Sequence, residues 1–184
     1  MLTGFNVTNM EKYVNMADII SAEELGDSEI LALIELLFFA YRDFVSDPDE
    51  ILAEIGFGRA HHRVVHFVGR DPGMTVAQLL DILRITKQSL GRVLKELIGK
   101  GYVCQKEGET DRRQRLVFLT PAGETLRQRL MAPQMARIRR ALAQSGREAG
   151  HHYRTMLYNL VSPENRGSVR DWIGKASIAG GGLG

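Results

Sequence analysis

The chain has 184 residues, a formal net charge of +2, a hydrophobic content of 44% and one cysteine. This length and composition predict a single globular domain with extensions, and one cysteine excludes an intrachain disulfide, so we expect a cytoplasmic protein. The near-neutral total conceals an asymmetry: residues 1–55 carry twelve acidic and two basic side chains, so the rest of the chain is basic, a distribution associated with nucleic-acid binding.

No segment of the sequence predicts insertion into a membrane. The most apolar run, residues 30–45, includes Glu35, Arg42 and Asp43 and is too short to span a bilayer. The first residues lack the basic segment, apolar segment and cleavage site of a secretory signal. We therefore expect a protein without a membrane partner.

The N-terminal part is predicted to be an acidic extension followed by helices. Residues 1–27 are read as the extension, and residues 28–73 as N-terminal helices for dimerisation and for linkage to the next domain. The helix at 28–45 has apolar residues on more than one face, so it must be buried on several sides, most simply against a second subunit. Residues 47–49, Asp-Pro-Asp, are expected to break it before a second helix at 50–69.

Residues 74–120 carry the pattern of a winged helix-turn-helix. Thr75 and Gln78 form a predicted capping box for a short helix, and Thr86 is placed to cap a second helix that runs to about Gly99. Apolar residues of this second helix recur at helical spacing and should share one buried face. They are Leu90, Val93, Leu94, Leu97 and Ile98.

The opposite face of the second helix is polar and basic. It consists of Lys87, Gln88, Gly91, Arg92 and Lys95. An ordinary exposed helix face can be cationic, but a helix that reads a DNA groove needs amide and cationic groups on one side. The predicted DNA-binding residues of this helix are Thr86, Lys87, Gln88, Ser89, Arg92 and Lys95.

A basic two-stranded ribbon is predicted next. Gly101 should end the helix, residues 102–105 and 115–119 read as two strands, and Thr120-Pro121 starts a new helix. Residues 84–115 carry nine Lys or Arg and four Asp or Glu, a local excess of about five positive charges, which favours double-stranded DNA as partner. A charged hairpin tip can also be merely solvated, but arginine suits a narrow minor groove. The predicted DNA-binding residues of the wing are Asp111, Arg112, Arg113 and Arg115.

Three segments resemble the multiple-antibiotic-resistance regulator (MarR) family, and the match covers about residues 56–125. They are Gly99-Lys100-Gly101-Tyr102-Val103, Asp111-Arg112-Arg113 and Leu116-Val117-Phe118-Leu119-Thr120-Pro121-Ala122-Gly123. The resemblance implies a homodimer with its winged domains on adjacent major grooves, often a repressor released by phenolic or other anionic ligands. It further implies that Arg113 reaches the minor groove, braced by an ion pair with Asp111, and that Arg92 is the family's recognition-helix arginine.

The C-terminal part is predicted to be helical and to complete the dimerisation region, over residues 121–176. The first helix, 121–145, should be kinked by Pro133. A helix at 153–161 and a short one at 169–175 follow, and residues 177–184 read as a flexible tail. In the helix at 121–145, one face is expected to be buried; it carries Leu126, Leu130, Ile138 and Leu142.

His62 and His66 lie one turn apart on the predicted helix at 50–69, and three roles remain open for them: packing or hydrogen bonding, lining an effector pocket, and binding a metal. No glutamate lies between them and no further ligand cluster is evident, so no metal or cofactor is expected, and we take them as candidate effector-pocket residues. Cys104 is expected to be a small buried residue rather than a sensor thiol.

These elements predict a mainly α protein with a small β-wing: a winged helix-turn-helix plus a helical dimerisation region formed by N- and C-terminal helices. The sequence has no nucleophile elbow, phosphate-binding loop or paired acids, so we expect no enzyme. We expect a homodimeric, sequence-specific transcriptional repressor that reads a pseudo-palindromic operator and responds to a small-molecule effector. The alternatives are a winged-helix protein-assembly module, a metal-dependent sensor and a non-specific architectural DNA binder.

Overall fold

A computed structural model describes residues 25–108 and 111–179. Residues 180–184 of the predicted tail and residues 1–24 of the predicted acidic extension lie outside the described residues. Residues 177–179, predicted as part of the flexible tail, instead belong to the last helix. The chain divides into two compact units: residues 41–137 form one, and the described residues before 41 and after 137 form the other. None of the helices in the described ranges is long and apolar enough to cross a membrane.

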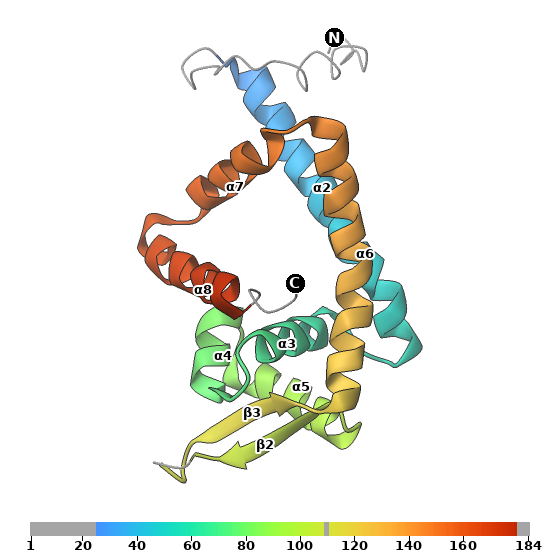
Figure 1. Cartoon of the computed structure of the whole chain (residues 1–184), viewed down its shortest axis with the longest axis vertical. Coiled ribbons are helices and arrows are strands. Elements are labelled where there is room, and N and C mark those ends of the chain that lie inside the picture. The colour runs from blue at the N-terminus through green and yellow to red at the C-terminus, as the bar shows by residue number, and fades with distance from the viewer. Residues whose placement is uncertain (1–24, 109–110, 180–184) are drawn as a thin grey trace. The chain divides into compact units, whose positions relative to one another are not determined.

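The protein is mainly helical with one small antiparallel sheet (Figure 1), which confirms the predicted fold class. The elements are α2 (Asp27–Glu54), α3 (Arg59–Arg70), β1 (Met74–Thr75), α4 (Val76–Leu83), α5 (Lys87–Gly99), β2 (Val103–Glu107), β3 (Arg115–Leu119), α6 (Pro121–Ser145), α7 (Ala149–Leu160), the 3-10 turn η2 (Pro163–Asn165) and α8 (Arg166–Ala179). The last helix is longer than the predicted 169–175, and α7 begins four residues before the predicted 153–161.

The sheet has three strands in the order β1-β3-β2, one more than the predicted ribbon. The extra strand β1 has two residues, which pair with β3 in the register Met74 with Val117. Gly73, at φ +89°, turns the chain into this strand and donates its N–H to the Val117 carbonyl at 2.9 Å. Cys104 pairs with Phe118 and is half-buried, so it is less enclosed than expected.

The core of the unit formed by residues 41–137 lies between α3, α4, α5 and the sheet. The apolar stripe of α5 is confirmed at Leu90, Val93, Leu94 and Leu97, all buried. Ile98 is 39% exposed, so its predicted burial is wrong. The reason is geometric: eight residues after Leu90 a side chain has rotated about 80° round the helix, toward the exposed face.

Helix α2 continues through Pro48, so the predicted break at 47–49 is wrong and the helix ends at Glu54. The break falls instead at residues 55–58, where Gly56 has φ +69°. A proline inside a helix leaves the carbonyl four residues earlier without its N–H donor. Here that carbonyl belongs to Phe44, and it accepts a hydrogen bond of 3.1 Å from the side-chain amide of Gln134 on α6. The helix can therefore tolerate Pro48.

Candidate nucleic-acid interface

The helix-turn-helix is formed by α4 and α5, and hydroxyl caps set both helix starts. Thr75 accepts a hydrogen bond from the Gln78 N–H at 3.2 Å, and its own N–H donates to the Gln78 side chain at 2.7 Å, which confirms the predicted capping box. Between the helices Arg84 adopts a left-handed conformation, φ +51°. Thr86 then caps α5 by accepting from the Ser89 N–H at 3.1 Å, as predicted.

The predicted recognition residues fall into two groups on α5. Lys87, Gln88, Arg92 and Lys95 are exposed along one side. Gly91 lies among them, with no heavy atom within 4 Å of the position of an added Cβ, so a flat surface can approach the helix there. Thr86 and Ser89 form the second group: Thr86 Oγ1 also donates to Ser89 Oγ at 2.9 Å, so these hydroxyls hold the start of the helix.

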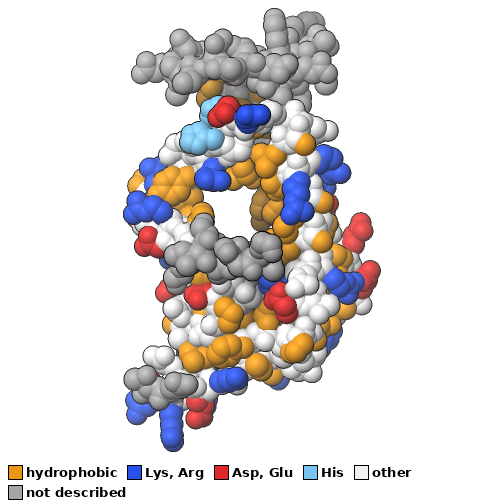
Figure 2. Space-filling view, in the orientation of Figure 1, with side chains coloured by type: hydrophobic (Ala, Val, Ile, Leu, Met, Phe, Trp, Pro, Cys, Tyr) orange, Lys and Arg blue, Asp and Glu red, His pale blue; other side chains and the backbone are white. Residues whose placement is uncertain are grey.

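The wing is the β2–β3 hairpin (Figure 1), and basic side chains lie near its end together with acidic ones (Figure 2). Arg112 and Arg113 are exposed near its tip. Asp111 Oδ1 accepts a hydrogen bond of 2.9 Å from the backbone N–H of Arg113, so this contact fixes the loop backbone rather than the guanidinium. Arg115 is paired across the strands with Glu107, at 2.8 Å.

The wing is joined closely to α6. Thr120 N–H donates to the Tyr102 carbonyl at 3.0 Å, and its hydroxyl donates to the Gly101 carbonyl at 2.6 Å and accepts from the Gly123 N–H at 3.1 Å. An added Cβ at Gly123 would lie 2.0 Å from the Tyr102 oxygen, so this position requires glycine. The predicted role of Thr120 as N-cap of α6 is confirmed.

His61, which the sequence reasoning did not assign to a site, contacts the recognition helix. Its side chain is 11% exposed, and Nε2 lies 2.9 Å from Oε2 of Glu96 on α5. The ring also stacks on Phe57, with centroids 4.4 Å apart.

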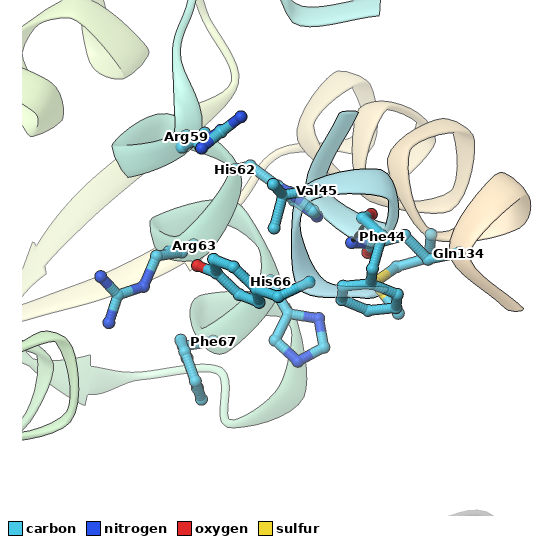
Figure 3. Close-up of a pocket in the computed structure, with 10 residues that line it drawn as sticks. Phe44, Val45, Arg59, His62, Arg63, His66, Phe67 and Gln134 are labelled. Carbon is cyan, nitrogen blue, oxygen red and sulfur yellow. Dashed lines mark hydrogen bonds between the residues drawn. The ribbon is translucent and has the colours of Figure 1, made fainter. Parts of the chain in front are cut away.

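A cavity of about 270 Å³ lies between α2, α3 and α6, within the unit formed by residues 41–137 (Figure 3). It contains the predicted pair His62 and His66, with Tyr41, Phe44, Val45, Arg59, Arg63, Phe67, Met131 and Gln134. Burial lowers the pKa of His62 and, helped by neighbouring positive groups, lowers the pKa of His66 to about 4. His66 Nδ1 is buried without a hydrogen-bond partner among the described residues.

The two arginines of the cavity wall are engaged elsewhere. Arg59 pairs with Asp49 at 2.7 Å, and Arg63 donates to the Leu83 carbonyl at 3.0 Å. Figure 3 shows the Arg63 guanidinium directed away from His66. The cavity is therefore mainly apolar with neutral imidazoles. Within the described ranges, no group of three His, Cys, Asp or Glu side chains could hold a metal ion.

A helix-turn-helix, an exposed basic face on its second helix and a β-hairpin with arginines at its tip define a winged helix-turn-helix protein. Residues 55–114 match the sequence model of the MarR family. The chain is 43% identical over 142 residues to the HTH-type transcriptional regulator PetP of Rhodobacter capsulatus, an alignment that covers 77% of this chain and 86% of PetP. The chain belongs to the MarR family of DNA-binding transcriptional regulators, which confirms the predicted class and the prediction that it is not an enzyme.

Solved structures share this fold. Streptococcus pneumoniae FabT in complex with DNA superposes with a TM-score of 0.64 at 19% identity, covering 71% of this chain and 94% of FabT. A mutant of MarR from E. coli, complexed with operator DNA, superposes with a TM-score of 0.57 at 20% identity, covering 73% of this chain and 96% of MarR.

Proposed function

We propose that the protein is a homodimeric, sequence-specific repressor that binds a pseudo-palindromic operator in the cytoplasm. Each subunit would place α5 in a major groove and the wing in the adjacent minor groove. The observation that carries this proposal is the exposed row of Lys87, Gln88, Arg92 and Lys95 around the open surface at Gly91. FabT and the MarR mutant share the fold and were solved in complex with DNA, which supports DNA as the partner.

The chemistry of the α5 row suits a major groove. Arg92 can donate two hydrogen bonds to one guanine, and Gln88 can both donate to and accept from an adenine. Lys87 and Lys95 are point charges suited to phosphates, which position a protein on DNA without reading its sequence. Two such subunits could neutralise about 6–10 phosphates, which would give a strongly salt-dependent affinity.

In the wing we assign the minor-groove contact to Arg113, with Arg112 beside it. Both are exposed, and the Asp111 contact fixes the backbone from which Arg113 projects. Arg115 was predicted to contact DNA as well, but its pairing with Glu107 ties it to the ribbon. We therefore propose that Arg115 stiffens the hairpin and contributes less to binding than Arg113.

Homodimerisation is proposed through the helices of residues 28–73 and 121–176. The N-terminal half of α2 exposes eight large apolar side chains, each at 40–68% of its area. They are Ile30, Leu31, Leu33, Ile34, Leu36, Leu37, Phe38 and Phe39. Helix α7 adds Tyr153, Met156, Leu157 and Leu160. Exposed apolar surface on this scale marks a protein interface, and most oligomers are symmetric homodimers.

We also propose that the cavity around His62 and His66 binds the effector. Its aromatic walls, its neutral imidazoles and its engaged arginines favour an aromatic ligand with a hydrogen-bonding group, such as an un-ionised phenol. The ligand would release DNA by binding more tightly to a conformation of the dimer in which the distance between the two winged domains does not fit the operator. Adding phenolic, anionic and metal candidates to the operator complex tests this, and unchanged affinity with all of them would contradict it.

The experiment that tests the function is selection of bound duplexes from a random DNA pool, followed by affinity measurements at near-physiological salt. We expect a palindromic winner bound at least ~10³-fold more tightly than a scrambled duplex. Weak binding without enrichment would instead indicate an architectural DNA binder. Absence of DNA binding would indicate a protein-assembly module.

A further inference from the structure

The imidazole of His61 connects α3 to the recognition helix in one defined tautomer. The Gly58 N–H donates to His61 Nδ1 at 3.1 Å, so Nδ1 carries no proton. Nε2 therefore bears the proton and donates it to Glu96 Oε2 at 2.9 Å. The hydrogen bond fixes the carboxylate of Glu96, although that side chain is 44% exposed.

The His61 ring is itself held on its other side. Phe57 stacks on it with an interplanar angle of 8° and meets the Tyr102 ring edge-on, with centroids 5.5 Å apart. Lys100, just after α5, places Nζ 4.7 Å from the centre of the Phe57 ring and also donates to the Ile55 carbonyl. The imidazole therefore cannot turn away from Glu96 without disrupting this packing.

Glu96 is the single acidic residue of α5, and at its position a negative charge can oppose DNA binding. It follows Arg92 by four residues, so the two side chains are neighbours on the helix surface. A carboxylate that was free to approach Arg92 would compete with DNA for the guanidinium. It would also repel phosphates close to the helix.

We propose that His61 is a positioning residue for DNA binding: it holds the Glu96 carboxylate on the α3 side of α5 and so leaves Arg92 available to the DNA. The inference rests on the proposed function, in which α5 contacts the major groove. It assigns a role to a residue that touches no DNA, and it explains how an acidic residue can stand beside a DNA-reading arginine.

The test compares His61→Phe, which keeps an aromatic ring against Phe57 but removes the hydrogen bond, with the double variant His61→Phe/Glu96→Gln. On the selected operator we expect His61→Phe to lower affinity on the order of 10-fold and to reduce the salt slope by about one. The double variant should recover the wild-type affinity, because the released side chain is then neutral. Asp81→Asn, which removes one exposed carboxylate on α4, is the control for the change of charge and should bind like the wild type.

A His61→Phe affinity equal to that of the wild type would overturn the inference. So would a loss that Glu96→Gln fails to recover, because that loss would reflect general damage to the fold. If His61→Phe does not fold, Glu96→Asp serves instead: its shorter carboxylate cannot reach His61, so we expect a loss, and retained affinity would overturn the inference. If the wild-type protein binds no operator specifically, both the proposed function and this inference are overturned. If the wild type binds a specific operator and the variants bind it equally well, only this inference is overturned.

Discussion

The side-chain amide of Gln134 on α6 replaces the helical hydrogen bond that Pro48 removes from α2, because it donates to the Phe44 carbonyl at 3.1 Å. Gln134 is only 5% exposed, and Pro48 is fully buried. A buried carbonyl without a donor is costly, so the two residues form one compensated pair although they are far apart in sequence. Nearby, the ion pair of Arg137 with Asp47, at 2.6 Å, joins the same two helices.

Gln134→Leu should lower the free energy of unfolding by about 1–3 kcal/mol, because it leaves the part-buried Phe44 carbonyl without a donor. Urea denaturation measures the loss. In a Pro48→Ala background the helix regains its own N–H donor, so the same substitution should cost less there. Equal costs in the two backgrounds would mean that Gln134 stabilises the protein in some other way.

Arg113→Ala should weaken operator binding by about 1–3 kcal/mol, because it removes the proposed minor-groove contact. Arg115→Ala is the matched variant from the same hairpin, and its effect should be smaller because Arg115 is paired with Glu107. Fluorescence anisotropy across a salt series measures both. If Arg113→Ala binds like the wild type at every salt concentration, Arg113 does not belong to the interface.

The free energy of unfolding should fall as pH falls from about 6.5 to about 4. Burial lowers the pKa of His66 from 6.5 to about 4, so in this range the unfolded state binds a proton that the folded state does not. The difference corresponds to a loss on the order of 3 kcal/mol, complete below pH 4. His66→Leu should flatten the pH profile relative to the wild type.

The matched control for this pH dependence is His152→Leu, at an exposed position outside the cavity. In this variant the free energy of unfolding should depend on pH as steeply as it does in the wild type. A slope that survives in His66→Leu would assign the pH dependence to other groups, and His62, whose pKa burial also lowers, would be the next substitution to make.

Phe38→Lys should shift the protein from dimer to monomer in sedimentation velocity experiments. Phe38 is 68% exposed on the apolar face of α2, and a lysine there would have to lose its hydration in the proposed interface. Ile98→Lys, at an exposed apolar position on α5, is the control and should not change the mass. A dimer that withstands Phe38→Lys would place the interface elsewhere.

Sequence reasoning succeeded where the determining interactions are local. Thr75, Thr86 and Thr120 each cap a helix through contacts within three residues, and such contacts can be read directly from the sequence. The exposed and buried faces of α5 follow from helical periodicity in the same way, except at its last turn. These local features were enough to predict the helix-turn-helix, the wing and the family.

The features that sequence reasoning missed depend on residues far apart in the chain. Pro48 looks like a helix break until Gln134 is placed beside it. Strand β1 has only two residues and exists because Val117 is available for pairing. His61 received no site assignment, because its partner Glu96 is 35 residues away in the sequence.

Strand β1 has a consequence for how the protein meets DNA. Thr75 is both the last residue of β1, paired with Leu116 of the wing, and the N-cap of α4. This pairing joins the hairpin to the helix-turn-helix, so the distance between the two elements proposed to bind the grooves is set when the protein folds. The conformational entropy that this alignment costs is then lost when the protein folds, not when it binds DNA. In the proposed complex the DNA would adapt its groove geometry to the protein, so base steps that bend easily between the two contact points should be favoured without being touched.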